Sequence, residues 1–134
     1  MDLPFLGKRD NFRLSGHLGE GYGTQLKGGP TEAVFNTASS NLDVIGIWSV
    51  GGGLQHFWID KLRSNLVLGH VSADNPASAP SDALESTTYA SANLIWNPFK
   101  MLTLGVECLW GRRENFDEAA GDSIRALFSS RYDF

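Results

Sequence analysis

The sequence predicts an all-β chain: an antiparallel up-and-down meander of about six long strands that forms part of a transmembrane β-barrel, or an open curved sheet if the chain stands alone. Three observations predict this fold. Apolar and polar residues alternate over long segments, the connections between these segments are alternately long and short, and aromatic residues gather where the segments end. The 134 residues are expected to form a single region, with strands over roughly 11–24, 46–59, 62–72, 87–97, 101–113 and 122–134.

The first five segments each place apolar residues at every second position, which is typical of a strand with one apolar face. In chain order these residues are Phe12, Leu14, Leu18 and Tyr22; Trp48, Val50, Leu54 and Trp58; Leu62, Leu66 and Leu68; Ala90, Ala92, Leu94 and Trp96; and Leu102, Leu104, Val106, Cys108 and Trp110. Glu20 interrupts the pattern and is expected to lie beyond the membrane. The segment lengths suit the ~9–11 residues of a tilted barrel strand, whereas soluble strands most often have ~5–6.

The last segment shows the alternation most clearly. Its apolar positions are Ile124, Ala126, Phe128, Tyr132 and Phe134, and Arg125, Ser129, Arg131 and Asp133 lie between them. A membrane barrel needs such a strand, because its outer face meets lipid and its inner face meets water. A last strand of a soluble sandwich would show the same pattern, so this segment alone leaves both folds open.

The connections favour the barrel. Asp60-Lys61 is a two-residue hairpin and Asn97 to Lys100 is a tight turn, whereas the connections over 26–41, 73–86 and 114–121 are long and polar. Outer-membrane barrels alternate short periplasmic turns with long external loops in this way. The aromatics agree with that assignment. Two interface girdles are expected, made of Trp58, Trp96, Phe99, Tyr132 and Phe134 near the short turns, and of Trp48 and Trp110, with His70, at the opposite ends.

Composition and motifs exclude several functions. The net charge is −4, with 11 Lys and Arg against 15 Asp and Glu, so no basic surplus is available for nucleic acid. Cys108 is the single cysteine and can form neither an internal disulfide nor a cysteine zinc site. His17 and Glu20, like His56 and Asp60, have spacings that make no metal face on a strand. No nucleophile elbow or dinucleotide fingerprint is present, so neither an enzyme nor a cofactor or metal site is expected.

Residues 89–98, 104–107 and 109–115 resemble the C-terminal end of the DcaP-like outer-membrane porins, trimeric diffusion channels of Gram-negative bacteria. Residues 55–58, 60–64 and 121–122 fit the same family, and the resemblance extends over about 11–134. It implies the final strands of a barrel of about sixteen strands, placed in the outer membrane behind a signal peptide. No such peptide precedes Asp10, which is consistent with a fragment. Cys108, where an aromatic is expected, and Asp133, where a basic or small polar residue is usual, depart from the family pattern.

The polar face supplies the candidate pore-lining residues, which are Arg13, His17, Arg63, Glu107, Arg125 and Arg131. Four arginines against Glu107 and Asp133 predict a mildly positive wall, and arginine favours anions. This agrees with the passage of small anionic solutes, such as dicarboxylates, that the resemblance implies. In a second interpretation the inward charges pair across strands and only brace the wall.

The function expected is therefore an outer-membrane porin fragment, part of the wall of a passive channel for small hydrophilic, anionic solutes. The expected partners are outer-membrane lipid, two further copies in a homotrimer, and the barrel-assembly machinery that engages the C-terminal strand ending in Phe134. The alternative is a soluble β-barrel or sandwich that encloses a small apolar ligand. The two differ in the direction that the apolar face points. About six strands are too few to close a membrane barrel, so two open edges are expected, at 12–22 and 124–134.

Overall fold

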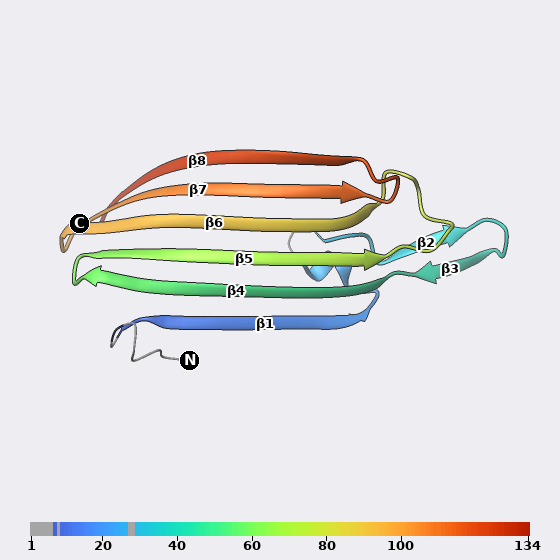
Figure 1. Cartoon of the computed structure of the whole chain (residues 1–134), viewed down its shortest axis with the longest axis horizontal. Coiled ribbons are helices and arrows are strands. Elements are labelled where there is room, and N and C mark those ends of the chain that lie inside the picture. Colours follow the sequence, from blue (N-terminus) through green and yellow to red (C-terminus); the bar gives the residue numbers. More distant parts are fainter. Residues whose placement is uncertain (1–6, 8, 27–28) are drawn as a thin grey trace.

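A computed structural model describes residues 7, 9–26 and 29–134 (Figure 1). Its main element is a six-stranded sheet in the order β1-β4-β5-β6-β7-β8, in which all neighbours are antiparallel. These strands are β1 (Asn11–Glu20), β4 (Gly46–Ile59), β5 (Leu62–Asp74), β6 (Leu84–Phe99), β7 (Leu102–Asn115) and β8 (Ala120–Tyr132). The predicted all-β meander of about six long strands is confirmed. In the described part of the chain, β1 and β8 are the edges of the sheet, which is therefore open.

The strand limits differ from the expected ones at the end with the long connections. β5 continues to Asp74, because this residue still pairs with Gly46 on β4, and β6 begins at Leu84, because this residue pairs with Asn115 on β7. β1 instead stops at Glu20. The next residue, Gly21, has a φ of 65°, which favours glycine, and its N–H bonds to the Ile45 carbonyl (3.1 Å).

The first long connection is not a plain loop. It holds a short 3-10 helix, η1 (Gly23–Gln25), and a hairpin of β2 (Ala33–Asn36) and β3 (Asn41–Val44), which projects beyond the sheet (Figure 1). The Asn36 side chain shapes the hairpin turn, because its Oδ1 accepts the N–H groups of Ala38 (3.0 Å) and Ser39 (3.2 Å). The sequence analysis expected only a polar loop here, since each of the two strands has just four residues.

The register keeps the two kinds of side chain on separate faces across all six strands. One row of partners is Leu14, Gly52, Leu68, Ala90, Trp110 and Ile124. The neighbouring row, which points to the opposite face, is Arg13, Gly53, Val67, Ser91, Leu109 and Arg125. We call the side of Leu68 and Ile124 the apolar face and the side of Arg13 and Arg125 the polar face. Because the side-chain period is two, a slip of one residue at any strand would break both faces.

Few side chains are buried in this sheet. Among the described residues, the buried apolar ones are Ile45, Ile47 and Ala73, and Tyr22, Leu26, Val34 and Val71 pack against them. This small cluster lies where the first long connection meets β4 and β5. Leu14, Leu18, Ile124 and Phe128 are all at least 71% exposed. No helix in the described ranges is long and apolar enough to cross a membrane.

Candidate functional site

The polar face carries a ladder of amide side chains across its middle strands. Gln55 Nε2 donates to Asn65 Oδ1 (2.9 Å), and Asn65 Nδ2 donates in turn to Asn93 Oδ1 (2.8 Å). Glu107 follows Asn93 in register on β7, so the row ends in a carboxylate. The sequence analysis considered only the charged residues and missed these amides, although each of them stands at a polar-face position. The ladder gives the face a continuous polar strip that water and hydrophilic solutes can contact.

The candidate arginines differ in their partners. Arg131 pairs with Asp133, the residue directly after β8, with Nη2 2.7 Å and Nε 2.8 Å from Oδ1. Arg63 donates from Nη1 to the Asn97 side chain (3.4 Å). The Arg131 pair does not cross between strands as the bracing interpretation requires, and Arg13, Arg63 and Arg125 have no carboxylate partner among the described residues.

Two hollows divide the candidate residues. A hollow of about 710 Å³ brings together His17, Glu107 and Arg125 with Ser49, Thr87 and Leu26. A second hollow, of about 350 Å³, is lined by Arg13 and the amide ladder. Arg63 and Arg131 line neither of them. The candidate residues therefore lie in separate parts of the polar face, and the four arginines do not form one cluster.

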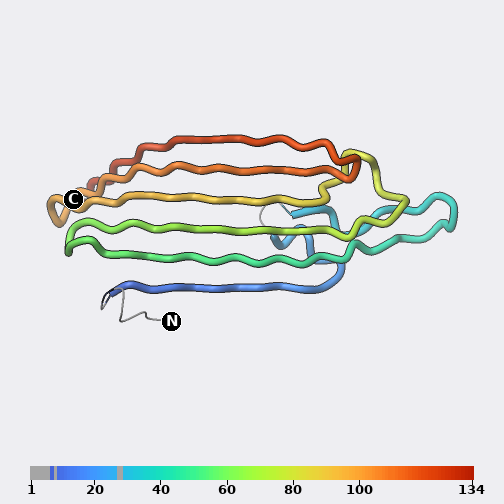
Figure 2. The backbone as a smooth tube through the Cα atoms, viewed as in Figure 1, coloured from blue at the N-terminus to red at the C-terminus, as the bar shows by residue number. Residues whose placement is uncertain are grey.

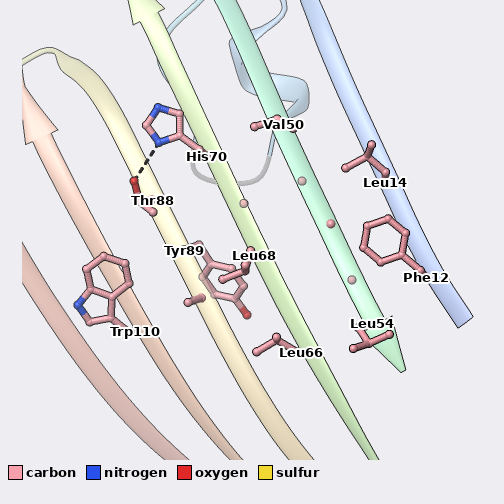
Figure 3. A pocket seen from close by; sticks show the side chains of 15 residues that line it. Phe12, Leu14, Val50, Leu54, Leu66, Leu68, His70, Thr88, Tyr89 and Trp110 are labelled. Atoms are coloured by element: carbon pink, nitrogen blue, oxygen red, sulfur yellow. Dashed lines mark hydrogen bonds between the residues drawn. The ribbon is translucent and has the colours of Figure 1, made fainter. Parts of the chain in front are cut away.

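The apolar face has a hollow of its own, shown in Figure 3. Its volume is about 450 Å³, and its lining includes Leu14, Leu66, Leu68 and Trp110 around the glycines at positions 51–53. The labelled polar contact there is a hydrogen bond between His70 Nδ1 and Thr88 Oγ1 (2.9 Å) (Figure 3). A soluble ligand-binding barrel would enclose such a face, whereas here it is open. The alternative function is therefore not supported.

Most of the aromatic residues of the predicted girdles lie near strand ends, and the girdles themselves stay a prediction. Trp58, Trp96 and Phe99 lie at the short-turn ends of β4 and β6, as Tyr132 does on β8, and all four are exposed. Phe134 follows β8 and is exposed as well. At the other end the Trp48 ring contacts the His70 ring in a tilted arrangement, with ring centroids 5.1 Å apart. Trp110 instead lies inside β7, because that strand continues to Asn115. Its place in a girdle stays a prediction.

Side-chain contacts at the short-turn end join the segment before β1 to β4. Asp10 is only 1% exposed; its Oδ1 accepts the Phe57 N–H (2.8 Å) and its Oδ2 contacts His56 Nδ1 (2.6 Å). The Phe57 N–H is the main cause that lowers the pKa of Asp10 below its usual value, and it outweighs burial, which raises that pKa. Arg9 lies over the Phe57 ring and pairs with Asp60 at 2.5 Å. The sequence analysis missed Asp10, whose partners are more than forty residues away.

The long connections are joined to one another at the opposite end. Asp43 Oδ2 accepts hydrogen bonds from Asn36 Nδ2 (2.8 Å) and from Ser78 Oγ (2.7 Å), which ties the β2–β3 hairpin to the β5–β6 loop. Arg113 Nη2 then donates to the Asp82 carbonyl (3.0 Å), which ties that loop to the end of β7. Arg112 pairs across strands with Asp122 (3.7 Å), its partner in register.

The described residues contain no group of three His, Cys, Asp or Glu side chains that could hold a metal ion. What they contain is a sheet of long antiparallel strands, with one face apolar and exposed and the other polar. Aromatic side chains stand at the short-turn ends of this sheet. This combination is typical of the wall of an outer-membrane β-barrel.

The chain belongs to the DcaP outer membrane protein family, whose model matches residues 32–134. Among solved structures it is similar to the crystal structure of the outer membrane channel DcaP of Acinetobacter baumannii, with 26% sequence identity and a TM-score of 0.74. That alignment covers 81% of this chain and 32% of the channel, so the chain spans about a third of that channel's length. A search of curated proteins finds no match. The resemblance noted in the sequence and the outer-membrane location are confirmed.

Proposed function

We propose that the chain forms part of the wall of a passive diffusion channel for small hydrophilic solutes and that this channel prefers anions. The observation that carries the preference is the state of the arginines on the polar face. Arg13 and Arg125 form no ion pair with a described carboxylate, and Arg125 lines the same hollow as His17. Uncompensated arginine in a channel wall attracts anions and offers carboxylates two parallel hydrogen bonds. Glu107 lines that hollow as well and offsets the charge of Arg125, so the positive surplus of the face comes from Arg13 and Arg63, which form no ion pair with a described carboxylate.

Closure of the channel requires further strands. The sheet has six strands in sequence along one meander, and membrane barrels begin at about eight. We infer that additional strands pair with β1 and β8, supplied either by a longer chain of which these residues are the C-terminal part or by further copies. The trimer implied by the family resemblance, and the recognition of β8 and Phe134 by the barrel-assembly machinery, belong to the same proposal. We call the closed assembly the complete channel.

Charge reversal in the complete channel tests the anion preference. Arg125→Glu should shift the reversal potential in a salt gradient towards cation preference, because it replaces an unpaired positive charge in the hollow with a negative one. Arg13→Glu should act in the same direction. Arg131→Glu is the matched control, since it changes the charge by the same two units at a position that lines neither hollow and should produce a smaller shift.

The proposed anion preference is refuted if neither Arg125→Glu nor Arg13→Glu moves the reversal potential while the channel still conducts. Unfolding of both variants to the same degree as an outer-face substitution would show that the two faces have been assigned the wrong way round. Both measurements use planar bilayers, and folding is followed separately by urea titration.

A further inference from the structure

The segment that follows β1 doubles back over the sheet before the β2–β3 hairpin projects outward (Figure 2). The left-handed backbone at Gly21 turns the chain, and the Tyr22 hydroxyl then donates to the Ile47 carbonyl (3.2 Å). Two turn hydrogen bonds, from Gln25 N to Tyr22 O and from Leu26 N to Gly23 O, close η1. The path is therefore determined by contacts with β4 and by its own turn.

An apolar patch on the polar face holds this segment. Ile47 is in register with Gly19 and Ala73, and it lies two residues from Ser49, so its side chain points to the polar face. Ile47 and Ala73 are nevertheless buried, because Tyr22 and Leu26 pack on them. Aliphatic side chains on a face that meets water are stabilised only if another segment covers them. The patch is therefore best explained as the surface on which this segment packs.

The segment lies very close to its neighbours at Gly23. A Cβ at this position would stand 2.1 Å from the Pro30 carbonyl oxygen and 3.0 Å from Ile47 Cδ1. A glycine is therefore needed for the close approach of η1 to the backbone at Pro30. Gly121, at the start of β8, is the contrasting case, since a Cβ there would meet nothing within 4 Å.

Leu26 is half-buried and lines the same hollow as His17, Glu107 and Arg125. We propose that η1 and Leu26 form a constriction over the polar face, and that the size of the Leu26 side chain limits the size of the solutes that pass. This inference rests on the proposed function, because it requires the polar face to line the channel. It assigns two separate properties to two parts of one hollow: Leu26 limits the size of the solutes that pass, and Arg125 sets the preference for their charge.

Substitutions at Leu26 in the complete channel test the constriction. Leu26→Ala should raise the single-channel conductance roughly 1.5-fold and admit larger neutral sugars in liposome-swelling assays, because it widens the opening. Leu26→Trp should lower both. Neither variant changes charge, so the reversal potential should stay at the wild-type value. Leu42→Ala, at a 68% exposed position on the projecting hairpin, is the matched control and should leave conductance unchanged.

Gly23→Ala provides a second test that does not alter Leu26. The added methyl group cannot fit against Pro30, so η1 should move off the apolar patch and conductance should rise. Gly121→Ala should behave as wild type. The inference is overturned if both Leu26 variants and Gly23→Ala conduct as wild type, or if Leu26→Ala and Leu26→Trp change conductance in the same direction. In either case Arg125→Glu can still shift ion preference, and the proposed function then stands without the constriction.

Discussion

Replacing Leu68 with Arg, and separately Val67 with Arg, compares the two faces of the sheet at the middle of β5. The two residues are neighbours on one strand and point to opposite faces, Leu68 to the apolar face and Val67 to the polar face. Leu68 is 54% exposed and Val67 is 38% exposed. If the sheet lay in water, both substitutions would change the free energy of unfolding by about 0.5 kcal/mol or less, and Leu68→Arg would be the milder one.

In a bilayer the order of the two effects is reversed. An Arg on the lipid face near the midplane destabilises a barrel by ~2–4 kcal/mol, whereas a charge on the channel face stays in water. Leu68→Arg should therefore lower the folding equilibrium constant roughly 30- to 700-fold, at about 1.4 kcal/mol for each factor of ten. Val67→Arg should stay close to wild type. The more exposed position is thus predicted to be the more sensitive one.

Urea unfolding of the complete channel in lipid vesicles, followed by tryptophan fluorescence, measures both changes. The chain contains four tryptophans that report on its environment. The reasoning is refuted if Val67→Arg destabilises as much as Leu68→Arg, or if both variants stay within about 0.5 kcal/mol of wild type.

Two further predictions concern the ends of the sheet. The lowered pKa of Asp10 means that its contact with Phe57 stabilises the fold fully above the ordinary value of 3.8, and this stabilisation is lost as pH falls through the lower folded-state pKa. Asp10→Asn should therefore have a lower urea midpoint than wild type at pH 7, with a gap that closes in acid; a gap independent of pH would contradict this. Ser78→Ala removes one hydrogen bond to Asp43, worth about 1 kcal/mol, so hydrogen exchange in β3 should speed up roughly fivefold. An unchanged exchange rate would show that the tie does not hold the hairpin.

The six-stranded meander could be predicted because three local signals agree. Alternation with a period of two assigns each side chain to a face, and the short turns at Asp60-Lys61 and Asn97 to Lys100 make their flanking strands antiparallel neighbours. Register then follows, since one face must stay apolar. Arg13 and Arg125 accordingly fall on the same face in the structure, as the sequence predicts, although they stand at opposite edges of the sheet.

The parts that could not be predicted depend on contacts between distant residues. Asp10 is an unremarkable carboxylate in the sequence, and only the fold brings it to Phe57 and His56. The packing of the η1 segment on β4 had a signal in the sequence that was not used. Ile45 and Ile47 stand at positions that alternation assigns to the polar face, directly before Trp48. Apolar residues at alternate polar-face positions near a strand end indicate that another segment of the chain packs on them.

The β2–β3 hairpin illustrates a different limit. Four residues are too few to separate a strand from a loop by periodicity, and the surrounding stretch is rich in Gly, Ser, Thr and Asn. Its pairing is supported by side chains, through Asn36 at the turn and Asp43 across the strands. Such short hairpins follow from specific hydrogen bonds, which composition alone does not reveal.

Thiol labelling tests most directly the central claim that the apolar face meets lipid and the polar face meets the water of a channel. Cys108 lies on the apolar face in register with Ala92 and Ala126, and Leu109 lies beside it on the polar face in register with Ser91 and Arg125. Two proteins are compared in vesicles, wild type and the double variant Cys108→Ala, Leu109→Cys. A charged, membrane-impermeant thiol reagent should leave wild type unlabelled and label the double variant, while a lipid-soluble maleimide should label wild type. Rapid labelling of Cys108 by the charged reagent, with none in the double variant, would contradict the claim.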